Sequence, residues 1–336
     1  MSRARSAFGF AGRGLPAALF AGILVAVAVL HLTPLRERLD GAALDLTQRL
    51  ARAVAPRPAI EEVVIVGIDE ETERRFPEPF ALWHRPLGEA LAAIAQGNPR
   101  LVALDIALPE QSYDSLIPGL DAALIRGLVA AKHPDRLVVG LKLDAHGKSQ
   151  KVDNLLLAAI GLDALGLAYV TVDRDGTARR VAPARGGDGT GLPLMTERIG
   201  RRLGLDQSPG IIDFACGRPL RYVPMQDVLD WGKERPDALA IAFAGKIVLV
   251  GKVGPDEDPV RQPLSLADWM PDASAPPGVV LLAQTVRAMQ SGRIVGELPG
   301  SALAALVAVC AAVVLVGGGL WRTWAAAGLL LSGVVL

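Results

Sequence analysis

The sequence predicts an α/β fold with a mixed sheet flanked by helices, joined to one N-terminal and at least two C-terminal transmembrane helices, the last incomplete. Uncharged apolar runs near both ends of the 336-residue chain predict the membrane helices. Between them, short β-branched runs alternate with helical patterns, as in α/β domains. One segment of alternating polarity around an Asp-Gly pair predicts a hairpin, so the sheet should be mixed rather than purely parallel.

The composition excludes some classes of protein. Hydrophobic residues make up 51% of the chain, which suits membrane segments beside one large or two modest domains. Lys and Arg (35) balance Asp and Glu (35) without forming a basic stripe, so we expect no nucleic-acid partner. Of the two cysteines, only Cys310 lies in an apolar run, and this pattern argues against a disulfide framework.

The first apolar run, residues 14–34, has no charge and follows three arginines within residues 1–13. At about 1.5 Å per residue, a helix of this length crosses a hydrocarbon core of about 30 Å. A cleaved signal peptide fits the same pattern, but the small-x-small pair Ala26 and Ala28 lies inside the apolar run. An uncleaved anchor is therefore the favoured interpretation.

A second uncharged run covers residues 298–321 and is also long enough to span a bilayer. After Arg322 the chain turns apolar again over 323–336, which reaches only about 21 Å as a helix. We therefore expect the start of a further transmembrane helix that belongs to a longer protein. Positive charges near the spans are nearly balanced, so the positive-inside rule does not set the orientation.

The segment between the spans begins with apolar residues at helical spacing over 35–54, which predicts an amphipathic juxtamembrane helix. Packing onto the domain or a partner is favoured over lying on a lipid surface. Apolar runs then predict strands at 63–68, 101–106, 136–143, 211–216 and 246–251, and the hairpin covers 167–183. Helical patterns, the first with proline in its first turn, lie at 86–98, 119–132, 193–204 and 276–293.

Acidic side chains follow two of the predicted strands. Asp69 and Asp105 stand at the carboxyl ends, where open α/β sheets usually bind ligands. A metal or an acid–base site is conceivable there. The favoured alternative is that these carboxylates cap the following helices or face water. The four histidines lack ligand spacing and no catalytic motif occurs, so we predict no enzyme activity, metal or cofactor for this chain.

The pair Gly251-Lys252 follows an apolar strand and invites comparison with a phosphate-binding loop. That loop needs a glycine where Lys246 stands and a hydroxyl where Val253 stands, so the pattern fails twice. The stretch is better interpreted as a buried strand that leads into a charged loop. We predict that this loop meets Asp69 and Asp105 at one edge of the sheet and supplies the candidate ligand-binding residues Lys252, Asp258 and Arg261.

Several motifs, in order, resemble the type-2 CHASE domain, an extracytoplasmic sensory module of bacterial membrane receptors. They are "VVIVGIDEET", "ALWHRPLGEALAAI", "LVALDIALPEQSYD", "DRDGTARRV", "GKIVLVGKVGPDEDPVRQPLS" and "PPGVVLLAQTVRAMQSGR". The similarity runs from Leu35 to Ile294, and the flanking spans fit the layout of the family. Arg85 joins the candidate ligand-binding residues because it belongs to the family's Trp-Pro-Arg-like element. That element is reduced here to Trp83-His84-Arg85-Pro86, and Val280 and Leu282 replace a Glu and a His common in the family.

The resemblance implies a multi-pass protein of the bacterial cytoplasmic (inner) membrane, with residues 1–13 in the cytoplasm and 35–297 outside it. It also implies an unknown extracytoplasmic ligand or protein, a homodimer, and a cyclase or kinase effector absent from this chain. Two other functions stay open: a membrane-anchored envelope scaffold, and a membrane-anchored α/β metal-dependent enzyme that uses Asp69 and Asp105.

Overall fold

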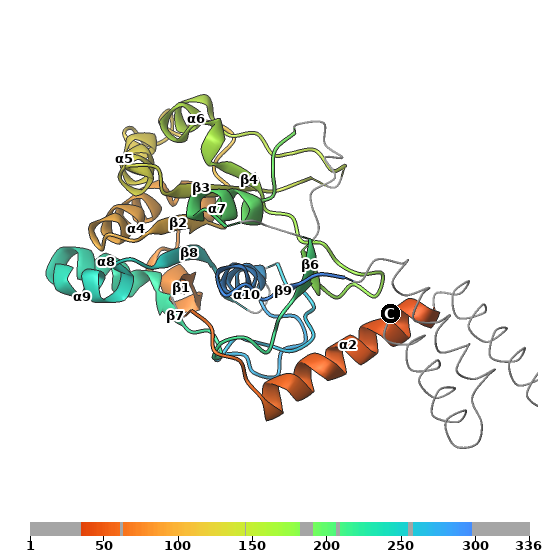
Figure 1. Cartoon of the computed structure of the whole chain (residues 1–336). Coiled ribbons are helices and arrows are strands. Elements are labelled where there is room, and N and C mark those ends of the chain that lie inside the picture. Colours follow the sequence, from red (N-terminus) through yellow and green to blue (C-terminus); the bar gives the residue numbers. More distant parts are fainter. Residues whose placement is uncertain are drawn as a thin grey trace, which may run out of the picture. The chain divides into compact units, whose positions relative to one another are not determined.

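The computed structural model describes most of the region between the predicted spans, namely residues 35–60, 63–144, 146–181, 191–205, 209–254 and 258–297. Gln48–Gly296 forms one compact unit (Figure 1), and the described residues 35–47 and Glu297 lie outside it. The predicted spans 14–34, 298–321 and 323–336 lie outside the described residues. Within the described ranges, no helix is both long enough and apolar enough to cross a bilayer.

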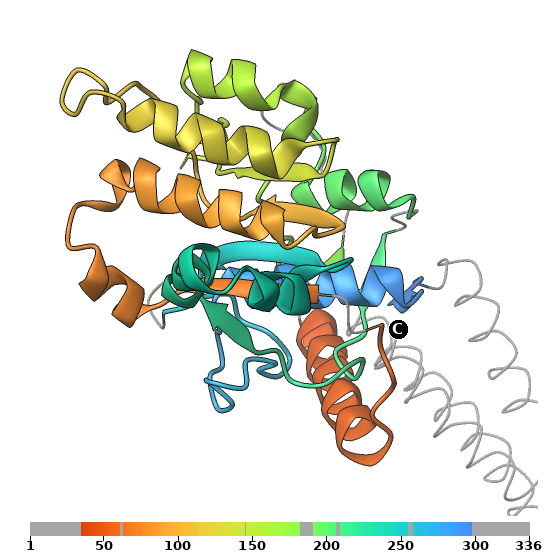
Figure 2. The same ribbon diagram turned by 90° about the vertical axis from the view of Figure 1, so that its left-hand side faces the viewer.

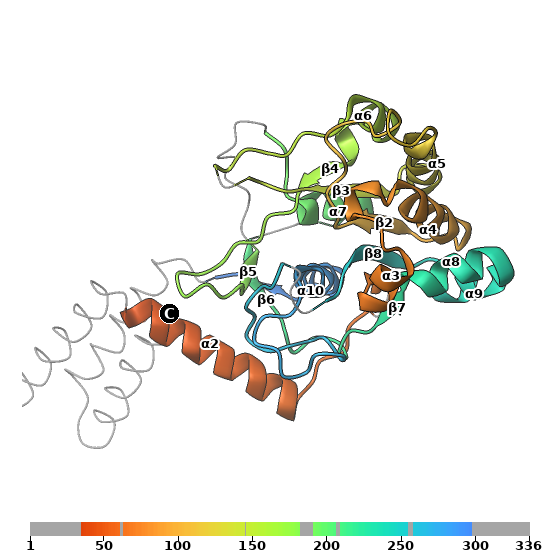
Figure 3. The same cartoon turned by 180° about the vertical axis from the view of Figure 1, so that it is seen from behind.

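A six-stranded parallel sheet, of order β4-β3-β2-β8-β1-β7, forms the centre of the Gln48–Gly296 unit (Figures 1 and 3). Its strands are β1 (Val63–Ile68), β2 (Leu101–Leu104), β3 (Leu137–Leu141), β4 (Leu165–Leu167), β7 (Tyr222–Pro224) and β8 (Ile247–Lys252). Strand β8 lies between β1 and β2, with Ile247 opposite both Val63 and Leu101. The centre of the sheet is thus completed by its last strand in sequence.

Side chains alternate between the two faces of the sheet, and helices cover both faces (Figure 2). Val66, Val102 and Val248 pack into one core with helices of the first face, whereas Ile65 and Leu249 point into the other core. The first face carries α4 (His84–Gln96), α5 (Leu120–Lys132), α6 (Asn154–Ile160), α8 (Met225–Glu234) and α9 (Pro236–Phe243). The second carries α7 (Met195–Leu203) and α10 (Gly278–Gln290). Burial on both faces explains the continuous apolar runs of the sequence.

Helices α4 and α5 approach each other closely because glycines face each other at their contact. A Cβ atom on Gly88 would lie 2.3 Å from the carbonyl oxygen of Ala123. A Cβ atom on Gly127 would lie 2.2 Å from the carbonyl oxygen of Gly88. Any larger residue would have to push the two backbones apart.

The predicted hairpin over 167–183 is wrong, although its turn is present. The amide of Asp173 donates to the carbonyl of Thr177 at 2.9 Å, and Gly176 takes the left-handed φ of +79° that favours glycine. Strand β4, however, pairs with β3, whereas β5 (Arg180–Val181) pairs with β6 (Gly210–Ile212). Among the named strands of the described residues, those that pair antiparallel are β5, β6 and β9 (Ile294–Val295), which form a small second sheet, so the main sheet is parallel and not mixed.

Helix α2 (Leu35–Val54) has the predicted bounds. Within the Gln48–Gly296 unit its last turns contact the end of β6 and the loop that follows it through polar side chains. Gln48 Nε2 donates to the carbonyl of Ile212 at 3.3 Å, and Arg52 Nη1 donates to that of Phe214 at 3.0 Å. Apolar Leu50 and Val54 are exposed. The packing predicted for this helix therefore occurs in its last turns through polar rather than apolar contacts.

Candidate functional site at the carboxyl edge of the sheet

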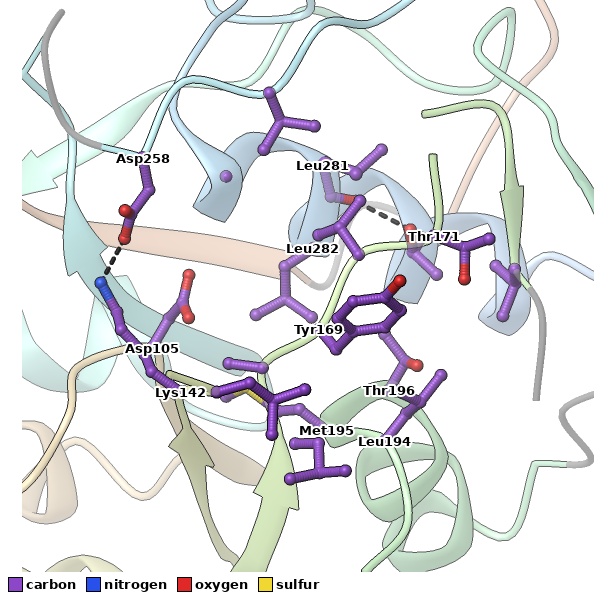
Figure 4. A pocket seen from close by; sticks show the side chains of 18 of the residues that line it. Asp105, Lys142, Tyr169, Thr171, Leu194, Met195, Thr196, Asp258, Leu281 and Leu282 are labelled. Atoms are coloured by element: carbon purple, nitrogen blue, oxygen red, sulfur yellow. Dashed lines mark hydrogen bonds and ion pairs between the residues drawn. The ribbon is translucent and has the colours of Figure 1, made fainter. Parts of the chain in front are cut away.

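A cavity of about 580 Å³ opens beyond the carboxyl ends of β2, β3 and β4 (Figure 4). Helix α10 forms one wall and the start of α7 another, and both cover the same face of the sheet. The small sheet contributes Arg180, Val181 and Ile212. This volume is typical of small-molecule sites, and an open α/β sheet usually binds ligands at this edge.

One side of this pocket carries three charged residues, Asp105, Lys142 and Asp258, and we call it the charged side. Asp105 directly follows β2, and its amide donates to the carbonyl of Val250 in β8 at 2.8 Å, which fixes its backbone. Lys142 directly follows β3 and forms an ion pair with Asp258 from the loop after β8 (Figure 4). Three chain segments distant in sequence therefore meet at one edge.

Burial raises the pKa of Asp105 from 3.8 to about 6, because the charged carboxylate loses contact with water. The ammonium of Lys142 opposes this increase, and the carboxylate of Asp258 adds to it. Part of the Asp105 side chain faces the pocket, so its protonation state depends on what fills that space. Asp105 can therefore respond to an occupant of the pocket.

The opposite side of the pocket carries hydroxyl groups from Thr171 and Thr196 (Figure 4), and Thr285 of α10 also lines the pocket. Thr285 Oγ1 donates to the carbonyl of Leu281 at 2.8 Å, one turn earlier in α10. Between the two sides the wall is mostly apolar and includes Leu143, Leu167, Val170, Leu194, Met195, Leu281 and Leu282. The pocket thus combines an apolar middle with polar groups at both ends.

The "DRDGTARRV" motif builds the turn beside this pocket. Arg179 is only 2% exposed, and its two terminal nitrogens reach Asp173 Oδ2 at 2.9 Å and Asp175 Oδ2 at 2.8 Å. Hydrogen bonding to Arg179 lowers the pKa of Asp175 to about 2. Arg179 is thus a structural clamp, whereas Arg180 lines the pocket and pairs with Asp173.

Lys252 reaches the same edge from the end of β8. It lines a smaller cavity of about 240 Å³ together with Asp105, Lys142 and Asp258. Its Nζ lies 3.2 Å from Glu73 Oε1 and 4.8 Å from the centre of the Phe80 ring. The structure therefore brings together three of the six predicted site residues: Asp105, Lys252 and Asp258.

Asp69 acts as a helix cap rather than as a pocket residue. Its Oδ1 accepts hydrogen bonds from Thr72 N at 2.8 Å and Thr72 Oγ1 at 2.7 Å, at the start of α3 (Glu70–Arg75). Strand β8 separates β1 from β2, so the strands that precede Asp69 and Asp105 stand about 10 Å apart. Within the described residues, no group of three His, Cys, Asp or Glu side chains is arranged to hold a metal ion.

Arg85 and Arg261 line neither cavity. Arg85 is exposed in the first turn of α4. Arg261 is also exposed, and its backbone carbonyl accepts a hydrogen bond from Ala178 N at 2.8 Å. Sequence reasoning missed Lys142, although a lysine at the end of an apolar strand was a signal that could have found it.

The sequence that contains these motifs matches the model of a known protein family. A model of the CHASE2 domain matches residues 22–320. The chain belongs to the CHASE2 family. CHASE2 domains are sensory extracellular modules, which agrees with the resemblance inferred from the motifs. No curated protein and no solved structure matches the chain.

The two departures of this CHASE2 domain from the family pattern have different surroundings. In α10, Val280 is fully buried in the core, whereas Leu282 lines the pocket. In the Trp83-to-Pro86 element, His84 is buried with Nδ1 2.9 Å from Asp121 Oδ1. Trp83 and His84 of this element therefore pack inside the CHASE2 domain, whereas Arg85 is exposed, and Leu282 adds to the apolar wall of the pocket.

Proposed function

We propose that this chain is the input module of a bacterial transmembrane receptor and not itself an enzyme. Residues 35–297 sense an extracytoplasmic signal, and the span at 298–321 passes it to a cytoplasmic cyclase or kinase effector. The observation that carries this proposal is the pocket, because α10 forms its wall and leads along the chain toward that span. A homodimer in the cytoplasmic membrane is part of the same proposal.

The loop that bears Asp258 connects the pocket to the start of α10. Val260 N donates to the carbonyl of Pro276 at 3.0 Å, and Pro259 forms an antiparallel bridge with Pro277. These contacts lie directly before α10. A ligand in the pocket contacts this loop at Asp258 and α10 at Leu281 and Leu282, and it therefore acts on the helix that leads to the span. Such a ligand would shift the balance between two packings of α10.

The test uses the chain fused to an adenylate cyclase, with cyclic AMP measured in a bacterial host that lacks its own cyclase. Leu282→Trp fills the pocket from α10, where Leu282 is one of the lining residues. We expect a changed basal output, because the larger side chain mimics occupancy. Ile241→Trp, at a position 77% exposed on α9, is the control and should leave output unchanged. Equal output from wild type and Leu282→Trp, at equal protein levels, would argue against the pocket as the input site.

A further inference from the structure

The charged side of the pocket has an uneven balance of charge. It contributes two carboxyl groups, Asp105 and Asp258, against one ammonium group, Lys142. Lys142 is already paired with Asp258. Among the residues that the structure describes, no side chain forms a hydrogen bond or an ion pair with the carboxyl group of Asp105. A partly buried carboxylate without a partner costs free energy, and a ligand group could supply the missing partner.

We propose that the pocket binds a small amphiphilic cation, which has an apolar body and a terminal ammonium or guanidinium group that pairs with Asp105. The proposal deepens the proposed function, on which it rests, by naming the chemical class of the signal. Asp105 would serve as the counter-ion, and the charge-assisted hydrogen bonds would fix the orientation of the ligand.

The body of the ligand should be apolar because the middle of the pocket is. Leu143 and Leu167 lie near the ends of β3 and β4, Met195 begins α7, and Leu281 and Leu282 come from α10 (Figure 4). Covering these side chains removes apolar surface from water, which favours binding in proportion to the area covered. A compact polar solute would leave this wall uncovered.

An anionic ligand suits the charged side less well. A carboxylate or phosphate would have to displace Asp258 from Lys142 and would then stand beside Asp105. Asp144, which also lines the pocket, adds negative charge. Of the other cations near the pocket, Arg180 is paired with Asp173 and Lys252 with Glu73. A cation instead meets Asp105 directly and leaves the Lys142–Asp258 pair intact.

The experiment compares three probes of equal length on the full chain in lipid nanodiscs: 4-phenylbutylamine, 4-phenylbutanol and 4-phenylbutanoate. Isothermal titration calorimetry gives each dissociation constant, with empty nanodiscs as the baseline for partition into lipid. We expect the amine to bind about 10- to 100-fold more tightly than the alcohol, as for a hydrogen bond to a charged group. The carboxylate should bind more weakly than the alcohol.

Two variants identify the counter-ion. Asp105→Asn keeps the shape of the side chain but removes its charge, so the preference for the amine over the alcohol should fall below about 3-fold. Lys142→Met removes a nearby positive charge and should tighten amine binding without improving that of the carboxylate. Asp272→Asn, at an exposed position outside the pocket, is the matched control and should behave as wild type.

Preferential binding of the carboxylate, the absence of amine binding, or an amine preference that survives Asp105→Asn would each overturn the proposal. If Asp105→Asn does not fold, as judged by circular dichroism, the Lys142→Met result decides, because weaker amine binding there contradicts the assignment. Failure of the proposed function has a different signature. In that case the amine binds with the expected preference, but the cyclase fusion gives the same output with and without it.

Discussion

Asp105 couples the electrostatics of the pocket to the stability of the domain. Because the folded state raises its pKa from 3.8 to about 6, the folded state holds the proton more tightly than the unfolded chain. The contribution of protonated Asp105 to the free energy of unfolding is therefore fully present below about pH 4, and it is lost as the pH rises through 6. An ionised Asp105 therefore lowers the free energy of unfolding of the domain at neutral pH.

We expect Asp105→Asn to stabilise the domain at pH 7.5 by about 1–2 kcal/mol, less than the full shift implies because the pocket admits solvent. The gain should vanish near pH 4, where the wild-type carboxyl group is protonated. Thermal denaturation of both proteins at pH 4, 6 and 7.5 measures this difference. A difference that stays constant across the pH range would mean that Asp105 does not titrate as described.

Arg179 is the buried clamp of the "DRDGTARRV" turn, so its removal leaves Asp175 without its main partner. We expect Arg179→Met to destabilise the domain by about 3 kcal/mol at pH 7. Chemical denaturation measures the change, with Arg174→Ala on the exposed surface of the same turn as the control. Because Asp175 has a lowered pKa of about 2, the stabilisation it gains from Arg179 is lost as the pH falls from about 4 to 2. The effect of Arg179→Met should shrink over the same interval.

At the scale of elements, the contact between α4 and α5 depends on the absence of side chains at Gly88 and Gly127. We expect Gly127→Ala to destabilise the domain by about 1–3 kcal/mol from overpacking, despite the better helix propensity of alanine. The control is Gly296→Ala, where a Cβ atom meets nothing within 4 Å. Equal melting temperatures for the two variants would contradict this prediction, because they would show that α4 and α5 can move apart without a loss of stability.

The sequence predicted best those elements in which burial alone determines the spacing of apolar residues. Buried strands such as β1 and β8 show continuous apolar runs because both faces are covered, and α2 has a clear helical period. The three-residue strand β7 and the helix α8 were missed, since a short edge strand and a helix beginning after proline carry weaker patterns. The hairpin failed because local alternation does not reveal which strand becomes the partner.

The order of the strands also limited what the sequence could predict about the candidate site. Parallel strands place their carboxyl ends at one edge, so Asp105 and Lys252 could be placed there from the sequence alone. The role of Asp69 as a cap matched the alternative that was favoured for the acidic residues. The Lys142–Asp258 pair could not be predicted, because strand order decides that β3 lies two places from β8.

At the scale of the whole molecule, both hydrophobic cores lie within the Gln48–Gly296 unit and meet at the sheet. We expect amide hydrogen exchange to be slowest in β8 and β2, because these strands have neighbours on both sides and helices on both faces. The edge strands β4 and β7 should exchange faster. Mass spectrometry of exchange time courses measures this order, and slower exchange in β7 than in β8 would contradict it.

The position of β8 also bears on how the domain is made. While the chain is synthesised from its N-terminus, β1 emerges about 180 residues and β2 about 140 residues before the strand that belongs between them. Until Lys252 has left the ribosome, these two strands have no native neighbour on their facing edges. Such unpaired apolar edges are typical sites of aggregation in nascent chains. Ribosome release and chaperone protection would thus matter more for this domain than for one whose neighbouring strands follow each other in sequence.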